Sequence, residues 1–171
     1  MQRALFRAAK KLVFRRNIYG MSGKKIVVAS GYFNPIHPGH IEYLQKAKKL
    51  GDILIVIVNN DRQAALKTGF CFMSCADRMA IVRALECVDC AVESIDEDRT
   101  VCKTLAMLRP NIFAKGGDQN AGTIPEAVVC KSLGIEIVDG LGDKIQSARW
   151  LLKEMKRNLE NVSEKYLNEG V

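Results

Sequence analysis

Residues 25–58, KIVVASGYFNPIHPGHIEYLQKAKKLGDILIVIV, contain the pattern from which the fold class follows. Two stretches in it, 25–30 and 53–58, are short, rich in Val and Ile and lack polar alternation, which is typical of strands covered on both faces. Between them, the apolar residues of 39–50 have helical spacing, and Gly51 follows as a helix stop. The stretch therefore predicts a strand, a helix and a second strand, the β-α-β unit of a parallel sheet.

The same alternation continues along the chain. Further strands are predicted at 91–94, 112–115 and 135–138, and further helices at 75–85, 100–108, 124–133 and 147–159. This order predicts an α/β fold, a Rossmann-like, doubly wound, parallel five-stranded sheet with helices on both faces. Ligands of such sheets bind at the carboxyl ends of the strands, so four loops should converge on one site: 30–40, 59–74, 115–123 and 139–147.

Length and composition fit one globular domain. The chain has 171 residues, of which 48% are hydrophobic, enough for a sizeable core but not for two full domains. The longest aliphatic run, 53–58, has six residues, whereas a membrane-spanning helix needs about 20. We therefore expect an intracellular protein without a transmembrane segment.

The net charge of +7 is concentrated near the N-terminus. Residues 1–25 hold eight Lys or Arg and no acidic residue, which leaves 18 basic and 19 acidic residues in the remainder. A nearly neutral body offers no electrostatic footprint for a nucleic acid, so no nucleic-acid partner is expected. We predict that 1–22 form a basic amphipathic extension and that 23–171 form the functional domain.

The extension has three interpretations. Its apolar residues form a stripe at helical spacing, with the basic residues mostly elsewhere: Leu5, Phe6, Ala9, Leu12 and Val13. An acid-free, Arg-rich amphipathic segment is typical of an organelle-targeting peptide, although the usual serines are missing. The same pattern fits a helix on an anionic membrane surface, or a helix docked on the domain or a partner subunit. The expected location is therefore cytoplasmic, or organellar if 1–20 act as a targeting peptide.

The six cysteines raise the question of a metal site. Cys71 with Cys75, and Cys87 with Cys90, form two closely spaced pairs that could supply four thiolates to zinc. Neither pair has the Gly-rich knuckle that usually surrounds a structural zinc ion, and no secretory signal indicates disulfides. We therefore predict no metal site and interpret the cysteines as small, buried apolar residues.

The loop after the first strand carries the most informative residues. Residues 31–40 read GYFNPIHPGH and contain both histidines of the chain. Two imidazoles beside the free N–H groups and positive dipole end of a helix form a site suited to a polyphosphate. Gly31 and Gly39 should let the backbone approach a ligand closely. The alternative is that His37 and His40 only cap the helix.

The loop contains an HxGH motif, His37-Pro38-Gly39-His40, and here the sequence resembles the nucleotidylyltransferase superfamily. The resemblance covers roughly 24–152. Four further stretches are similar to that superfamily's motifs and come in the same order: VNND at 58–61 with Leu66-Lys67, Ala76-Asp77-Arg78, KGGD at 115–118 and Lys144-Ile145-Gln146-Ser147-Ala148. Of these, KGGD is similar to the motif of the superfamily's sugar-phosphate branch.

The resemblance implies an activity. It implies transfer of a nucleotidyl group from CTP or ATP to a small phosphorylated acceptor, a sugar or polyol phosphate, with release of pyrophosphate. It implies His37, His40 and Lys67 as catalytic residues that bind the triphosphate and stabilise charge on the α-phosphoryl oxygens. It also implies a nucleotide site made of Gly31, Tyr32, Phe33, His37, Gly39, His40, Arg78, Lys115, Gly116, Gly117, Asp118, Lys144, Ile145 and Ser147. Mg²⁺ is expected to accompany the triphosphate, and homodimers are frequent in the superfamily.

The sequence departs from the superfamily's pattern at three positions. Asn34 stands where phospholipid-precursor cytidylyltransferases usually carry Asp, and 33–35 also resemble nicotinate mononucleotide adenylyltransferases. Ala148 replaces a common hydroxyl, and Gly69 stands where some cytidylyltransferases have a second Lys. The alternatives are therefore a phosphocholine-, phosphoethanolamine- or mononucleotide-specific member, or a nucleotide-binding pseudoenzyme.

Overall fold

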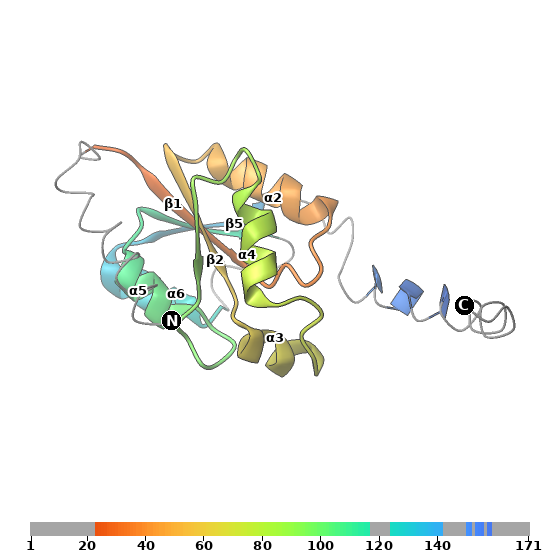
Figure 1. The fold of residues 1–171 in the computed structure, drawn as a ribbon. Helices are drawn as coiled ribbons and strands as arrows, with labels where there is room; N and C mark the ends of the chain where they lie inside the picture. The colour runs from red at the N-terminus through yellow and green to blue at the C-terminus, as the bar shows by residue number, and fades with distance from the viewer. Residues whose placement is uncertain (1–22, 117–123, 142–149, 152, 156, 159–171) are drawn as a thin grey trace, which may run out of the picture.

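The computed structural model describes residues 23–116, 124–141, 150, 151, 153–155, 157 and 158. Its strands are β1 (Ile26–Gly31), β2 (Ile53–Val58), β3 (Cys90–Glu93), β4 (Ile112–Gly116) and β5 (Glu136–Leu141). Its helices are α2 (Pro38–Lys48), α3 (Asp61–Thr68), α4 (Cys75–Arg83), α5 (Cys102–Leu108) and α6 (Glu126–Leu133). The strands form one parallel sheet in the order β3-β2-β1-β4-β5, and Figure 1 shows this sheet with its helices. The predicted doubly wound five-stranded sheet is thus confirmed.

The predicted elements lie close to the observed ones. All five strands, and the helices predicted at 39–50, 75–85, 100–108 and 124–133, are present with ends shifted by at most three residues. Of the helix predicted at 147–159, only residues 150, 151, 153–155, 157 and 158 are described, and these are helical. No helix in the described part of the chain is long and apolar enough to cross a membrane. The predicted extension, 1–22, lies outside the described residues.

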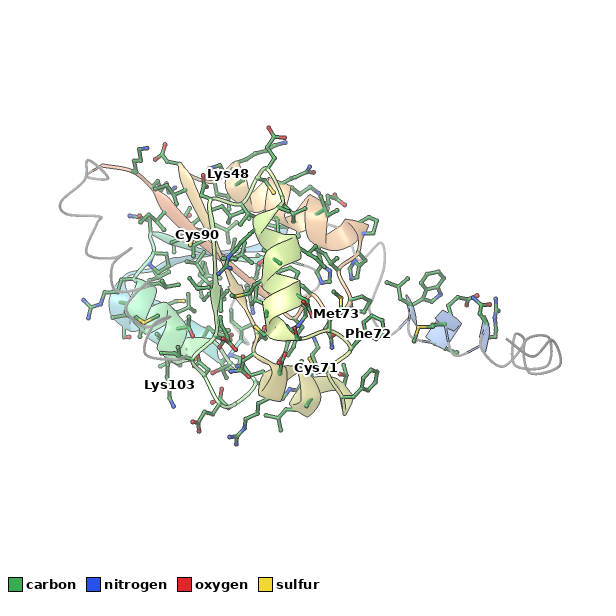
Figure 2. The ribbon with its side chains drawn as sticks, in the orientation of Figure 1. Lys48, Cys71, Phe72, Met73, Cys90 and Lys103 are labelled. Carbon is green, nitrogen blue, oxygen red and sulfur yellow. The ribbon has the colours of Figure 1, made fainter. Side chains whose placement is uncertain are left out.

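Helix α3 corrects the expectation that 59–74 form a loop throughout. Its only buried residues are Gln63 and Ala64, so it has no apolar stripe to reveal it. Instead, its ends define it. The Asn60 side chain accepts the N–H of Gln63, the Gln63 side chain accepts the N–H of Asn60, and Gly69 ends the helix at a φ of 86°. The segment after it, with Cys71, Phe72 and Met73, leads into α4 (Figure 2).

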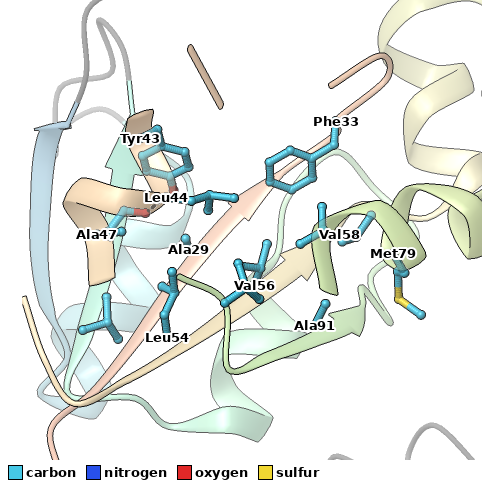
Figure 3. Packing of buried hydrophobic residues seen from close by; sticks show 14 of the residues in the cluster. Ala29, Phe33, Tyr43, Leu44, Ala47, Leu54, Val56, Val58, Met79 and Ala91 are labelled. Atoms are coloured by element: carbon cyan, nitrogen blue, oxygen red, sulfur yellow. Dashed lines mark hydrogen bonds between the residues drawn. The ribbon is translucent and has the colours of Figure 1, made fainter. Parts of the chain in front are cut away.

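Helices cover both faces of the sheet, which explains why the central strands are apolar without alternation. On one face, α2 and α4 pack against side chains such as Val27, Ala29 and Val56 (Figure 3). On the other face, α5 and α6 pack against side chains such as Val28 and Ile57. Successive strand residues therefore belong to two different cores.

Tyr43 of α2 stands at the topological switch point, where the strand order turns from β2-β1 to β4-β5. The last residue pair in the β1–β4 register is Ala29 with Ala114. Next to it, the buried Tyr43 hydroxyl donates to the Ala114 carbonyl at 2.7 Å and accepts the Ser30 N–H at 3.2 Å. Tyr43 thus joins the two strand ends at the crevice where ligands of such sheets bind.

We expect Tyr43→Phe to lower the free energy of unfolding by about 2 kcal/mol, because the buried Ala114 carbonyl and the partly buried Ser30 N–H lose their partner. Tyr32→Phe is the matched control, since the Tyr32 hydroxyl makes only a long 3.5 Å contact with the Arg99 carbonyl. Urea unfolding followed by circular dichroism measures both. Equal stability of the two variants would show that the Tyr43 hydroxyl contributes nothing.

Candidate active site

His37 and His40 lie side by side at the start of α2. His37 is the N-cap and His40 is the third residue of the helix. Their rings stack with centroids 3.7 Å apart and planes at 25°. The His37 backbone N–H donates to His40 Nδ1 at 3.3 Å, so the proton of a neutral His40 must be on Nε2, which is then a donor. The first turn of α2 has no acidic residue, so its dipole favours an anion.

Helix capping alone does not account for this pair. It explains His40 Nδ1, which accepts a backbone N–H. The His37 side chain also faces the backbone N–H of His40, so the two residues form a reciprocal capping box. His37 Nδ1 nevertheless makes no hydrogen bond of good geometry, and it is the one such buried side-chain nitrogen or oxygen among the described residues. Buried polar groups normally have a partner, so the capping box leaves one nitrogen to which a ligand could bind.

Two glycines leave room for aromatic rings of the site. Phe33 is buried at a φ of 50°, and its ring meets His40 edge-on with centroids 5.0 Å apart. A Cβ on Gly31 would lie 2.7 Å from the Phe33 ring, and one on Gly39 would lie 3.3 Å from the His37 ring. We predicted that these glycines admit a ligand. In the structure, Gly31 leaves room for the Phe33 ring and Gly39 leaves room for the His37 ring.

Burial keeps both imidazoles neutral. It lowers the pKa of His40 to about 3, with smaller contributions from the neighbouring His37 imidazole and from the positive charge of Lys67. It also lowers the pKa of His37. At neutral pH the pair is therefore uncharged, and the positive charge offered to a ligand comes from Lys67 and the α2 dipole.

The depressed His40 pKa predicts a loss of stability in acid. Between its unfolded pKa of about 6.5 and its folded pKa of about 3, only the unfolded chain binds a proton at His40, so the free energy of unfolding falls as the pH falls. The slope is at most about 1.4 kcal/mol per pH unit. In His40→Gln, which keeps an acceptor for the His37 N–H, the decline between about pH 6 and 4 should be shallower. Urea unfolding at several pH values measures the decline. An equally steep decline in the wild type and in His40→Gln would contradict this prediction.

Lys67 lies with the histidines although it follows them by 27 residues or more in the sequence. It is in the last turn of α3 and is exposed, and its Nζ is 3.9 Å from the centroid of the Tyr32 ring. Its charge also acts on His40, whose pKa it helps to lower. The structure therefore brings together the three predicted catalytic residues and Tyr32. The unpredicted helix α3 is what positions Lys67.

Arg78 corrects a prediction. We expected it to contact the nucleotide, but its side chain is 1% exposed. All five N–H groups of the guanidinium donate to acceptors within the protein. A phosphate would find no free donor on this guanidinium.

The KGGD stretch is described only at its first two residues. Lys115 lies on the α5–α6 face of the sheet with Phe113, 3.9 Å from a carboxylate oxygen of Glu126, and burial lowers its pKa. The structure thus does not bring Lys115 to the histidines, which lie on the α2 side. Gly116 is beside Tyr43, because a Cβ there would be 2.9 Å from that ring. The remaining predicted site residues lie outside the described residues: Gly117, Asp118, Lys144, Ile145 and Ser147.

Comparison with known families agrees with the fold and the histidine loop. The sequence model of the family described as cytidylyltransferase-like matches residues 28–163, from β1 through the C-terminal helical residues. The chain belongs to the cytidylyltransferase-like family. The resemblance to nucleotidylyltransferases inferred from HxGH is thereby confirmed.

Two relatives illustrate the sequence similarity. The chain is 36% identical over 147 residues to the bifunctional protein HldE of Pelobacter propionicus, covering 84% of this chain but 28% of that protein. It is 38% identical over 118 residues to the D-beta-D-heptose 1-phosphate adenylyltransferase of Bordetella bronchiseptica, covering 67% of this chain and 72% of that one. The chain thus spans about a quarter of the bifunctional relative's length.

Solved structures show the same fold. A lipopolysaccharide core biosynthesis protein from Thermoplasma volcanium has a TM-score of 0.61 and 30% identity, covering 70% of this chain and 98% of that one. A pantoate-beta-alanine ligase from Francisella tularensis has a TM-score of 0.55, covering 84% of this chain and 66% of that one. Since its identity is only 15%, it shows the fold alone.

Two positions at which this cytidylyltransferase-like chain departs from the pattern have structural roles. Gly69 has a φ of 86° and ends α3, a conformation that a lysine would adopt only with strain. Asn34 is 4% exposed, and its side-chain oxygen accepts the N–H of Met73 at 3.0 Å. The role of Gly69 could have been predicted from the cap residues before it. The contact of Asn34 could not, because it joins residues 39 positions apart.

The cysteines of this family member are partly as predicted. All six are free, and Cys75 and Cys130 are buried, whereas the other four are partly exposed. Burial raises the pKa of Cys75 to about 12 and that of Cys130 to about 11, so both remain thiols at neutral pH. Among the described residues, no three His, Cys, Asp or Glu side chains are grouped so that they could hold a metal ion.

Proposed function

We propose that this chain transfers a nucleotidyl group from CTP or ATP to a small sugar or polyol phosphate and releases pyrophosphate. The observation that carries the proposal is the stacked, neutral His37–His40 pair at the N-terminus of α2, with the Lys67 ammonium nearby. This combination provides donors and positive charge for a triphosphate, and the first turn of α2 has no acidic residue.

The reaction needs positioning and charge stabilisation more than proton transfer. An oxygen of the acceptor phosphate attacks the α-phosphorus, the bond from that phosphorus to the bridging oxygen breaks, and pyrophosphate leaves with the electron pair. The acceptor phosphate is already ionised at neutral pH, so no base is required. His40 Nε2–H, the first N–H groups of α2 and Lys67 would stabilise the charge on the phosphoryl oxygens.

Mg²⁺ is proposed as the companion of the triphosphate. Among the described residues there is no cluster of ligands for a protein-held ion, which fits an ion that takes most of its ligands from substrate phosphates and water. Bound in this way, the ion would neutralise part of the phosphate charge. The chain's own residues would then contact the remaining phosphate oxygens.

The choice of a sugar phosphate rests on relatives. The Bordetella bronchiseptica relative is named for adenylyl transfer to D-beta-D-heptose 1-phosphate, and the KGGD stretch at 115–118 resembles the same branch. Neither separates CTP from ATP here. Both nucleotides therefore remain in the proposal.

Pyrophosphate release tests the proposal. The full chain would be incubated with Mg²⁺, each of ATP, CTP, GTP and UTP, and one acceptor at a time: heptose 1-phosphate, glycerol 3-phosphate, phosphocholine, phosphoethanolamine or nicotinate mononucleotide. We expect acceptor-dependent release with a sugar or polyol phosphate and with ATP or CTP. Release with phosphocholine, phosphoethanolamine or the mononucleotide alone would refute the acceptor class. Triphosphate binding without release for any acceptor would identify a pseudoenzyme.

A further inference from the structure

We propose that Arg78 is a positioning residue that locks the histidine loop, α3 and the segment 69–74 into one arrangement. The inference deepens the proposed function, because it concerns the residues that hold the transferase site together. It assigns to Arg78 a role that does not require contact with a substrate.

The contacts of Arg78 reach four segments. Its side chain is the largest of those that are fully buried among the described residues. Nε donates to the Met73 carbonyl at 2.9 Å, and Nη1 donates to the carbonyls of Tyr32 and Asn59 at 2.7 and 2.6 Å. Nη2 donates to the Asp61 carboxylate at 2.7 Å and to Cys71 Sγ at 3.8 Å.

Each acceptor belongs to a part of the site. Tyr32 precedes Phe33, whose ring supports His40. Asn59 follows β2, and Asp61 is the first residue of α3, the helix that carries Lys67. One guanidinium therefore fixes the separation between the histidine loop and the lysine helix.

The segment 69–74 is held from both sides. Arg78 donates a hydrogen bond to the Met73 carbonyl, and the Asn34 side chain of the histidine loop accepts the Met73 N–H. Met73 lies with Cys71 and Phe72 beside the start of α4 (Figure 2). The segment is therefore attached both to the histidine loop and to α4.

A lysine could not replace these contacts. An ammonium has three N–H groups on a point charge, whereas the guanidinium spreads five over a rigid plane and here uses all of them. Asp61, whose side chain is 53% exposed, supplies the negative partner for the buried charge. We therefore expect Arg78→Lys to loosen the arrangement while keeping the charge.

The experiment compares Arg78→Lys with Arg83→Lys, the same substitution on the same helix. Arg83 contacts Met79 and the Ala91 carbonyl, away from the histidine loop. Amide hydrogen exchange, measured on peptides that cover 32–36 and 69–74, reports how firmly these segments are held and does not depend on enzymatic activity. We expect exchange in both peptides to rise about tenfold or more in Arg78→Lys and to stay unchanged in Arg83→Lys.

Kinetics separate positioning from general stability. In Arg78→Lys, kcat per folded molecule should fall about tenfold or more with the KM for the acceptor nearly unchanged, because displaced groups lose transition-state contacts. Unchanged exchange, or an unchanged kcat, would overturn the proposal. If the wild type shows no transferase activity, the proposed function fails, and the exchange data alone decide whether Arg78 holds the segments.

Asp61→Asn provides the test if Arg78→Lys does not fold. It weakens one contact of the guanidinium at a largely exposed position and leaves the three carbonyl contacts. We expect faster exchange in 69–74 and a kcat lowered about threefold or more. Wild-type values for both quantities would refute the positioning role.

Discussion

His37→Ala and His40→Ala are each expected to lower kcat by about 10² or more while the fold stays intact. Preorganised donors aimed at developing charge are worth a few kcal/mol in a transition state, and 1.36 kcal/mol is a factor of ten in rate. Both rings lie at the start of α2, stacked on each other, and both residues are partly exposed. Their removal should therefore affect the reaction more than the fold.

Steady-state pyrophosphate release at saturating triphosphate measures this effect. Gln45→Ala is the control, because Gln45 is an exposed residue of the same helix. Circular dichroism would verify that each variant is folded. Turnover within about threefold of the wild type in either histidine variant would rule out the mechanism, since a transition-state contact of this kind costs far more when lost.

The fold was predictable because its signals are local. The runs at 25–30 and 53–58 are apolar on both faces, and the structure confirms that one face packs on α2 and α4 and the other on α5 and α6. Helix α3 was missed because its sequence carries only cap signals, Asn60 with Gln63 and Gly69, and no apolar periodicity. A search for capping boxes, and not only for periodicity, would have found it.

The site was predictable only where one motif carries it. The HxGH loop places both histidines within four residues, so their proximity follows from a helix start. The roles of Arg78 and Asn34 depend on partners 5 to 46 residues away in the sequence. Such contacts are set by the packing of loops against each other. The family resemblance therefore predicted that Arg78 would contact the nucleotide, but it did not predict that the side chain would be buried.

Lys67→Met is expected to lower kcat about 10- to 100-fold, because it removes a positive charge close to where negative charge develops. Lys67 is exposed, so the free energy of unfolding should change by no more than about 0.5 kcal/mol. Lys103→Met is the matched control, since Lys103 is an exposed lysine on α5. Pyrophosphate release measures both variants.

The division between kcat and KM then identifies what Lys67 does. Its Nζ lies 3.9 Å from the centroid of the Tyr32 ring, and its charge acts on His40. If it contacted the phosphates equally in the ground and transition states, Lys67→Met would raise the KM for the triphosphate and leave kcat unchanged. We expect the opposite, a lower kcat with a small change in KM, because the charge on the α-phosphoryl oxygens grows during the reaction. Lys67→Arg keeps the charge and should recover most of kcat. If Lys67→Arg and Lys67→Met had equally low kcat values, the site would require the shape of the ammonium rather than its charge.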